Sequence, residues 1–376
     1  MKSSITKIII FTLFIMLISC KADKKNDALN AETNIKSTLK YAKGFDIQHY
    51  NNYTKLTVKA PYQNSIETFE YILVTNKSKS DLKTIQIPIN SIVVTSTTHI
   101  PFLELLNVED KLAGFPNTDY VSSAKTRSLI EKGFIKDLGH EESINTELLL
   151  DLKPDLVVGF SLNSNNKTFS TIEKLGIPVL LNGDWLEETP LGRAEWIKFF
   201  GVLFDKEKMA DSIFNVLEKN YLEAKDIASK ATEKPTVISG GLFKDVWNLP
   251  AGDSFEAAFL KDANTNYLWK DSKGKGSLSL NIENVFEKGK DAEFWISPSY
   301  YKTLEQLNNA NDMYPKLRAV QNKNIFTYVN KQGENGGIIY FELAPARPDL
   351  VLKDLIKIAH PELLKNYELT FYERLK

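Results

Sequence analysis

The side chains that most often bind metals or move protons are few and scattered in this 376-residue chain. Its four histidines are His49, His99, His140 and His360, and none is followed by a second histidine at the short spacing of zinc sites. His99 follows a predicted buried strand, a position suited to a cleft, whereas His360 ends a predicted helix, where the dipole favours it. A bare zinc or manganese site is the alternative; we expect no metal ligands from the protein.

Signatures of catalysis are incomplete as well. Gly159-Phe160-Ser161 lacks the second glycine of a G-x-S-x-G nucleophile elbow, and no triad order of Ser, His and Asp surrounds it. The glycines in GENGG, residues 333–337, do not follow a phosphate-binding spacing. We therefore expect a protein that binds a ligand and is not an enzyme.

Aromatic side chains are concentrated in segments that follow predicted strands. Because ligands of α/β sheets bind beyond the carboxyl ends of parallel strands, such residues are candidates for the walls of a cleft. A large, partly apolar ligand needs such walls and few polar anchors, although each ring could instead pack inside a lobe. Arg347 would face an anionic ligand or form a surface salt bridge. The cleft candidates are His99, Tyr120, Phe160, Trp185, Phe243, Trp247, Tyr300, Tyr301, Tyr340 and Arg347.

Charge and length narrow the class of protein. The chain has 47 basic and 48 acidic side chains and a formal net charge of −1. A nucleic-acid binder needs an excess of Lys and Arg to replace phosphate counterions, so no nucleic-acid partner is expected. The length predicts two lobes that each bury a core, and we expect a monomer.

The first nineteen residues are unlike the rest. Lys2 and Lys7 precede an uncharged apolar run at 8–19. As a helix, this run would rise roughly 18 Å, less than the hydrocarbon core of about 30 Å. A basic start and a short apolar run are typical of a secretory signal peptide, which we predict at 1–19. A short membrane anchor is the alternative.

Cys20 is the only cysteine of the chain, so no internal disulfide can form. Leu17-Ile18-Ser19-Cys20 resembles a bacterial lipobox, which implies that Cys20 carries a lipid and begins the mature chain. The residues after it are polar and cannot bury enough apolar surface to offset their ordering entropy. We predict a lipidated flexible tether at 20–40.

Two patterns of hydrophobicity follow the tether. In 41–90, the segments FDIQHY, TKLTVKA and TFEYILVTN alternate apolar and polar residues, which predicts a short antiparallel β-rich extension. In 91–188, the uncharged runs IVVTS, KLAGF, LVVGF and PVLLN alternate with amphipathic helices. This alternation indicates a parallel sheet covered on both faces, the N-terminal α/β lobe. Gly176 is predicted to cap the helix before PVLLN.

A connecting helical region is predicted at 189–232. Over 205–230, apolar residues recur at three- and four-residue steps, with Asp205 as the expected N-cap of one stiff helix. The α/β alternation resumes over 233–376, the C-terminal lobe. The predicted fold class is α/β, with two Rossmann-like lobes joined by a single long α-helix and a short β-rich N-terminal extension. Such a rod favours lobe closure by only a few degrees.

Four segments carry a family resemblance. They are INTELLLDLKPDLVVGF, IEKLGIPVLLN, IENVFEKGKDAEFWIS and RPDLVLKDLIKIAHPELL. In this order, they resemble signatures of the class III, helical-backbone periplasmic binding proteins, which serve ABC importers of iron-siderophores and vitamin B12. The resemblance runs over about 91–364. It implies that Glu147 and Glu283, one in each lobe, dock onto arginines of the permease. Stabilisation of a helix N-terminus by each carboxylate is the alternative.

The resemblance also implies a function. We expect a lipid-anchored substrate-binding protein of the bacterial cell envelope and periplasm. It would capture a metal chelate, such as an iron-siderophore or cobalamin, between the lobes and deliver it to an ABC permease/ATPase complex. No resident cofactor is implied. The alternative is a hemophore-like or surface chelate-binding lipoprotein that acts without an ABC permease.

Overall fold

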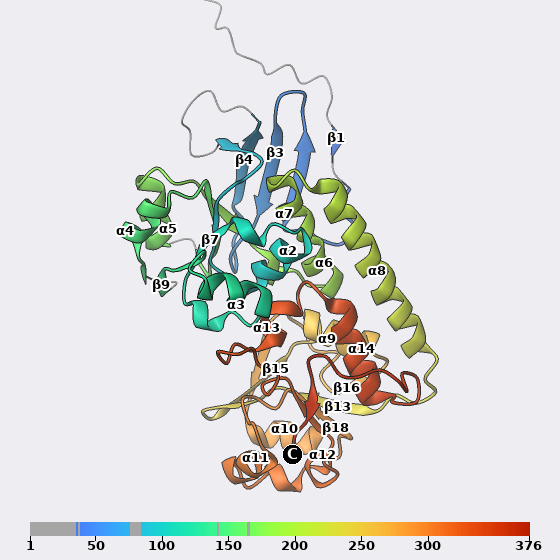
Figure 1. The fold of residues 1–376 in the computed structure, drawn as a ribbon. Coiled ribbons are helices and arrows are strands. Elements are labelled where there is room, and N and C mark those ends of the chain that lie inside the picture. Colours follow the sequence, from blue (N-terminus) through green and yellow to red (C-terminus); the bar gives the residue numbers. More distant parts are fainter. Residues whose placement is uncertain (1–34, 37, 76–83, 141–142, 164–165) are drawn as a thin grey trace, which may run out of the picture.

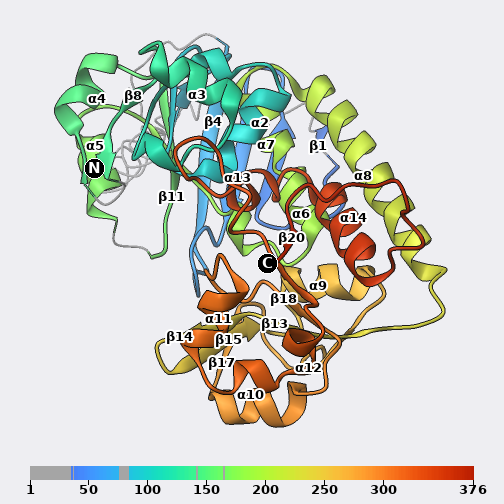
Figure 2. The same cartoon turned by 60° about the horizontal axis from the view of Figure 1, so that its bottom comes forward.

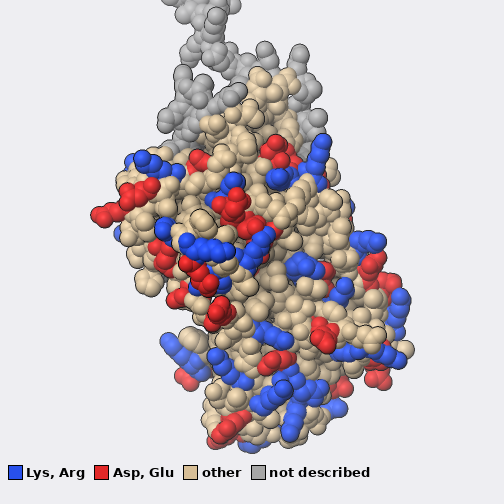
Figure 3. Space-filling model, in the orientation of Figure 1, with Lys and Arg blue, Asp and Glu red and all other residues tan. Residues whose placement is uncertain are grey.

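The computed structural model describes residues 35–36, 38–75, 84–140, 143–163 and 166–376 (Figure 1). The predicted signal peptide, the lipidation of Cys20 and nearly all of the predicted tether lie outside the described residues. No helix in the described part is long and apolar enough to cross a membrane. Acidic and basic side chains are interspersed over the face drawn in Figure 3, in keeping with the balanced charge of the chain.

A twisted β-sheet opens the described chain. Its order is β1-β2-β3-β4-β5, and all neighbours are antiparallel except the parallel pair β4 and β5. Alternate residues, such as Phe45, Leu56 and Val58, are buried and join the core of the N-terminal lobe. The extension therefore covers that lobe and shares its core. The strands are β1 (Ile35–Lys36), β2 (Phe45–His49), β3 (Thr54–Lys59), β4 (Thr68–Val74) and β5 (Thr84–Gln86).

The N-terminal lobe is built on a parallel sheet with the order β12-β11-β6-β7-β8. The central strands β6 and β11 are almost wholly apolar because helices and the extension cover both faces. The strands are β6 (Ile92–Val94), β7 (Leu112–Phe115), β8 (Lys136–Asp137), β11 (Leu156–Phe160) and β12 (Val179–Asn182), beside the short pair β9 (Gly139–His140) and β10 (Ser143–Ile144). The helices are α2 (Ile100–Leu105), α3 (Ala124–Glu131), α4 (Thr146–Leu152) and α5 (Lys167–Lys174).

Local signals set the ends of these helices. Asn145 caps α4 by accepting a hydrogen bond from the Leu148 backbone N–H at 3.0 Å. Gly176, with φ +86°, follows the last turn of α5, so the predicted C-terminal cap is confirmed.

Three helices connect the lobes: α6 (Pro190–Glu195), α7 (Ile197–Leu203) and the 23-residue α8 (Glu207–Ser229). The predicted N-cap of α8 is wrong. Lys206 occupies that position, and Asp205 has φ +55° and lies in the turn after α7.

The long helix α8 belongs to two cores. Ala210 and Phe214 in its first half pack into the core of the N-terminal lobe. Tyr221 and Ala224 in its second half pack into that of the C-terminal lobe, against α14 (Pro348–Ala359). Figures 1 and 2 show α8 running along one side of the molecule from one lobe to the other. The predicted fold class, two α/β lobes joined by one long helix, is confirmed.

The C-terminal lobe has two sheets. One has the order β16-β13-β18-β19-β20, parallel except for the last pair, and the other is antiparallel with the order β14-β15-β17. The strands are β13 (Thr236–Ser239), β14 (Gly241–Phe243), β15 (Val246–Pro250), β16 (Asn266–Tyr267), β17 (Ser277–Leu280), β18 (Phe294–Ile296), β19 (Ile325–Thr327) and β20 (Glu373–Arg374). The remaining helices are α9 (Phe255–Asp262), α10 (Ile282–Gly289), α11 (Leu304–Ala310), α12 (Arg318–Gln321) and α13 (Ile339–Leu343).

Residues 38–44 form a strap across the connecting helices. The buried Glu195 carboxylate of α6 accepts hydrogen bonds from the backbone N–H groups of Lys40, Tyr41 and Ala42 at 2.7–3.0 Å. The Tyr41 hydroxyl and the Lys40 ammonium both bind Glu218 of α8, at 2.8 and 2.6 Å. The chain is therefore fixed to α6 and α8 before its first long strand begins.

Candidate ligand cleft

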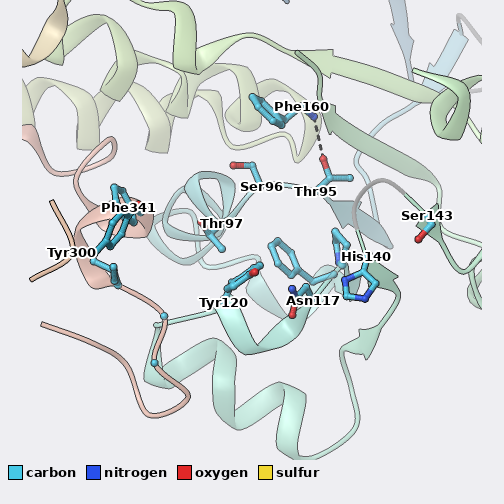
Figure 4. Close-up of a pocket in the computed structure, with 15 residues that line it drawn as sticks. Thr95, Ser96, Thr97, Asn117, Tyr120, His140, Ser143, Phe160, Tyr300 and Phe341 are labelled. Atoms are coloured by element: carbon cyan, nitrogen blue, oxygen red, sulfur yellow. Dashed lines mark hydrogen bonds between the residues drawn. The ribbon is translucent and has the colours of Figure 1, made fainter. Parts of the chain in front are cut away.

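A cleft of about 740 Å³ lies between the two lobes (Figure 4). Loops after β6, β7 and β11 form one wall, and the C-terminal lobe forms the other with Tyr300, Phe341 and the backbone of Gly336 and Gly337. The carboxyl ends of these parallel strands meet at one edge of the sheet, and ligand sites of α/β sheets form at such edges. We call this space the main cleft.

The N-terminal wall carries polar side chains beside the rings of Phe115, Tyr120 and Phe160. Thr95, Ser96 and Thr97 follow β6, and Asn117 follows β7. The Thr95 hydroxyl accepts a hydrogen bond from the Phe160 backbone N–H at 3.1 Å, which fixes the end of β11 against the loop after β6 (Figure 4). Small hydroxyl side chains on short loops leave room for a ligand and offer it hydrogen bonds.

The C-terminal wall is aromatic. Tyr300 and Phe341 remain 69% and 41% exposed and face the cleft (Figure 4). Behind Phe341, the rings of Tyr328 and Tyr340 stack with centroids 4.5 Å apart, and Phe341 meets Tyr328 edge-on. These contacts support the wall from inside the lobe.

Two further cavities adjoin the main cleft at Phe341. The C-terminal cavity, about 660 Å³, lies among Phe243, Tyr300 and Tyr301. The inner cavity, about 280 Å³, lies between the lobes and is lined by Arg193 of α6 and Glu256 of α9. The space between the lobes is therefore open and is not filled by the protein's own side chains.

The structure separates the predicted cleft residues into two groups. Those that line a cavity are Tyr120, Phe160 and Tyr300 in the main cleft, Phe243, Tyr300 and Tyr301 in the C-terminal cavity, and Tyr340 in the inner cavity. Those that line none of the three are His99, Trp185, Trp247 and Arg347. Ligand contact by the first group stays a prediction.

His99 requires a correction, because its side chain is 0% exposed. It points into the lobe, where its ring lies 5.5 Å from that of Phe200, and neither ring nitrogen has a hydrogen-bond partner among the described residues. Burial lowers the pKa of His99, although the nearby Asp184 carboxylate opposes this effect. A neutral, buried imidazole is not a cleft ligand.

The positions of the other three also differ from the prediction. Trp247 is buried in the C-terminal lobe and stacks on Trp295 at 5.1 Å, because the segment predicted as a loop forms the hairpin β14–β15. Arg347 makes a bidentate ion pair with Asp349 at 2.9 Å, the salt bridge that was the alternative. Trp185 lies behind Phe160, edge-on at 5.5 Å, and supports the wall without lining it.

Several cavity residues were not among the predicted ones. Gly336 and Gly337 line the main cleft, and a Cβ at Gly337 would lie 2.3 Å from the Tyr120 carbonyl oxygen. The GENGG segment is therefore explained by a close approach of the two lobes, which needs no phosphate. The three glycines of this segment were the sequence signal that could have indicated such a close approach. His140 and Ser143 also line the cleft, from a short hairpin that the sequence pattern did not indicate.

A carboxylate of the C-terminal lobe clasps the N-terminal lobe. Glu342 of α13 accepts hydrogen bonds from the backbone N–H groups of Ser122 and Ser123, at 2.7 and 2.9 Å, where α3 begins. Burial raises the pKa of Glu342 to about 7 in spite of these hydrogen bonds, and the nearby Glu104 carboxylate acts in the same direction. We call this contact the interlobe clasp.

Glu147 and Glu283 occupy matching places in the two lobes. Each is an exposed residue in the first turn of its helix, two positions after an asparagine N-cap. Asn281 caps α10 through the Asn284 backbone N–H at 2.9 Å, as Asn145 caps α4. No described residue pairs with either carboxylate, so both are available to a partner.

No three His, Cys, Asp or Glu side chains of the described residues come together as a group that could hold a metal ion. The cavities offer aromatic rings, hydroxyls and single charges. Such walls suit a ligand that brings its own metal ligands.

The chain belongs to the periplasmic binding protein family, whose sequence model matches residues 92–331, more than half of the chain. An uncharacterized lipoprotein of Methanocaldococcus jannaschii is 27% identical over 369 residues, which cover 91% of this chain and 86% of the relative. The expected family is therefore confirmed.

Solved structures share the fold at lower identity. A possible iron-binding, periplasmic solute-binding protein of Staphylococcus epidermidis superimposes with a TM-score of 0.56 at 18% identity, over 73% of this chain and 99% of its own. The CeuE protein of Helicobacter pylori, in a nickel-histidine complex, gives 0.57 at 18% identity, over 84% and 91%. Both support the two-lobed architecture.

Proposed function

We propose that this protein is a lipid-anchored substrate-binding protein that captures a metal chelate between its lobes and delivers it to an ABC importer. The observation that carries the proposal is the open main cleft of about 740 Å³ between the lobes, which adjoins a C-terminal cavity of about 660 Å³. Pockets that hold drug-sized molecules have volumes of about 300–1,000 Å³, and the main cleft lies within this range. Its volume therefore supports a ligand of the scale of a siderophore or a cobalamin-like molecule.

The composition of the walls favours an intact chelate over a bare ion. A bare divalent ion needs several carboxylate, imidazole or thiolate ligands at about 2 Å. The main cleft instead presents the rings of Tyr120 and Phe160 beside hydroxyls on its N-terminal wall, and the rings of Tyr300 and Phe341 on its C-terminal wall. Rings bind the apolar surface of a chelate, and hydroxyls orient its polar edge. The iron and nickel named for the two similar structures agree with this class of cargo.

The proposed anchoring rests on the N-terminal sequence, and the proposed delivery rests on two exposed carboxylates. The lipobox-like sequence before Cys20, together with the lipoprotein relative, supports attachment to a membrane of the cell envelope. The exposed carboxylates of Glu147 and Glu283 support docking, because two charges on separate lobes fix the orientation of a partner and report the closure of the lobes to it.

The first experiment is a tryptophan-fluorescence titration of residues 38–376 with haem, cobalamin, ferric citrate, a ferric hydroxamate and a ferric catecholate. At least one chelate should bind in the micromolar range or tighter, and free Fe³⁺, Ni²⁺ and Zn²⁺ should not compete. Failure of every chelate to bind would refute the proposed cargo.

The second experiment tests delivery. The double variant Glu147→Lys/Glu283→Lys should abolish stimulation of the cognate importer's ATPase while chelate affinity stays within twofold. The double variant Glu131→Lys/Glu287→Lys, on exposed helical positions away from the two caps, is the matched control. Unchanged coupling in the first double variant would favour a surface chelate-binding lipoprotein that needs no permease.

A further inference from the structure

Glu256 is a recessed carboxylate with no hydrogen-bond or ion-pair partner among the described residues. It lies in the first turn of α9, two residues after the N-cap Ser254. Its side chain lines the inner cavity, the C-terminal cavity and a small void of about 20 Å³ between them. It makes no hydrogen bond or ion pair with any other described residue, and burial raises its pKa. A carboxylate in such a place can accept hydrogen bonds from a ligand that enters the cavities.

Arg193 is not an ion-pair partner of Glu256. Its guanidinium lies over the Phe255 ring, 3.5 Å from the centroid, and donates hydrogen bonds to the backbone carbonyls of Trp185 and Glu187. It forms no ion pair with Glu256, although its charge acts on Glu256 from a distance and lowers the pKa of that carboxyl. The buried Asp184 favours the charged form of Arg193 even more strongly than Glu256 does. The charge of this one guanidinium therefore acts on Asp184 as well as on Glu256, and no ion pair holds the Glu256 carboxylate.

Aromatic rings surround the same carboxylate. Tyr340 shares the lining of the inner cavity with Glu256, and Tyr328 shares that of the C-terminal cavity. The Glu256 charge contributes, after burial, to the raised pKa of both hydroxyls. Phe259 and Phe341 complete the lining of the inner cavity. The faces of such rings carry partial negative charge and attract cations.

We propose that the recess around Glu256 binds a protonated amine, so that the cargo of the cleft carries an alkylammonium group beside its metal centre. This inference rests on the proposed function, which supplies the cargo. A carboxylate in a cavity lined by aromatic rings is the chemistry that recognises an organic cation, and an ammonium offers three N–H donors to a carboxylate that has no other partner among the described residues. The inner cavity, about 280 Å³, suits a short amino-alkyl arm and is too small for the chelate itself.

Stabilisation of the helix is the competing explanation, since a carboxylate in the first turn interacts favourably with the dipole. Glu305 separates the two interpretations. It occupies the same position in α11, two residues after the N-cap Thr303, and it is exposed. Only Glu256 faces cavities and aromatic rings, so only Glu256 should affect the recognition of an amine.

The test compares two chelates that differ by one charge. Ferrioxamine B is an iron(III) trihydroxamate that ends in a protonated amine, and its N-acetyl derivative keeps the iron centre but loses the charge. Isothermal titration of wild-type protein at pH 7 should show at least tenfold tighter binding of the amine form. The ratio is measured on the wild type, so it does not depend on the folding of any variant.

The variants then assign the preference to one side chain. Glu256→Gln should reduce the ratio to about one by weakening the amine form alone, whereas Glu305→Gln should leave the ratio unchanged. Equal binding of the two forms by the wild type, binding of neither, or an unchanged ratio in Glu256→Gln would overturn the assignment. If another chelate of the panel still binds, the proposed function survives such a result; if none binds, both fail.

Discussion

The two walls of the main cleft differ in chemistry. The N-terminal wall presents hydroxyls and an amide, such as Thr97 and Asn117, beside the rings of Tyr120 and Phe160, whereas the side chains of the C-terminal wall include the rings of Tyr300 and Phe341. Hydroxyls are well hydrated when the cleft is empty and gain little by exchanging water for ligand. Exposed rings gain free energy for every unit of apolar area that a ligand covers. We infer that the aromatic rings, those of the C-terminal wall included, supply most of the affinity and that the polar side chains of the N-terminal wall supply orientation.

Removal of the aromatic wall should have the largest effect. Tyr300→Ala and Phe341→Ala should each weaken binding of the cargo by about 2 kcal/mol, or roughly 30-fold, and the double variant by at least 100-fold. Tyr300 is 69% exposed, so Tyr300→Ala should change thermal unfolding little, whereas Phe341→Ala also loses the ring contacts with Tyr328 and Tyr340 and should lower the unfolding temperature. Isothermal titration with the chelate identified by the panel measures the effect.

Phe134→Ala provides the control for this loss. Phe134 is 68% exposed, like Tyr300, and does not line the main cleft. Its removal should leave affinity within twofold. A smaller loss in Tyr300→Ala than in Thr97→Val would reverse the assignment of the two walls.

The interlobe clasp predicts a pH dependence of the free energy of unfolding, similar in size to the loss of binding free energy expected for the aromatic variants. The pKa of Glu342 is raised from 4.5 to about 7 in the folded protein, so folding is favoured by its protonated form. The stabilisation is fully present below about pH 4.5 and is lost as the pH rises through about 7. The shift corresponds to a decrease of up to about 3 kcal/mol in the free energy of unfolding over this range.

Glu342→Gln should remove that part of the pH dependence, as measured by urea unfolding between pH 4 and 8. Glu334→Gln, an exposed residue of the neighbouring loop, should behave like the wild type. Other buried acids, such as Asp354, also have raised pKa values, so the difference between variant and wild type is the relevant quantity. Parallel curves for Glu342→Gln and wild type would show that the clasp does not titrate in this range.

Deletion of single hydroxyls should have the smallest effect. Thr97→Val and Tyr300→Phe remove one oxygen each while they keep the shape of the side chain. Each should change the affinity by less than about fivefold, because an exposed hydrogen bond is worth about 1 kcal/mol or less. Titration of both variants, side by side, would sharpen the comparison. A tenfold loss in Thr97→Val would show that the polar wall carries an anchor.

The sequence predicts the regular part of the fold well. The runs IVV, LVVGF and VLLN are uncharged because they lie in a covered parallel sheet, and they form β6, β11 and β12. The periodicity of α8 is visible because one face contacts cores along its whole length. Gly176 marks the end of α5 because capping is a local interaction.

The site is predicted less well because the direction of a side chain depends on tertiary packing. Trp247 looked like a loop residue until the strand pairing of β15 turned it onto Trp295. Glu342 and Glu256 have no local signal, since their environments are assembled from segments that lie far apart in the sequence. The rings of Tyr120 and Tyr300 were found because they follow strand ends, where the topology alone brings loops together.

The strap has a mechanical consequence. A pull on an anchor at Cys20, as proposed above, would act on the strap through the chain that precedes it. The strap is bonded to Glu195 of α6 and to Glu218 of α8, the elements that join the lobes. Such a force would therefore act on the connecting helices α6 and α8 and not on the two walls of the main cleft.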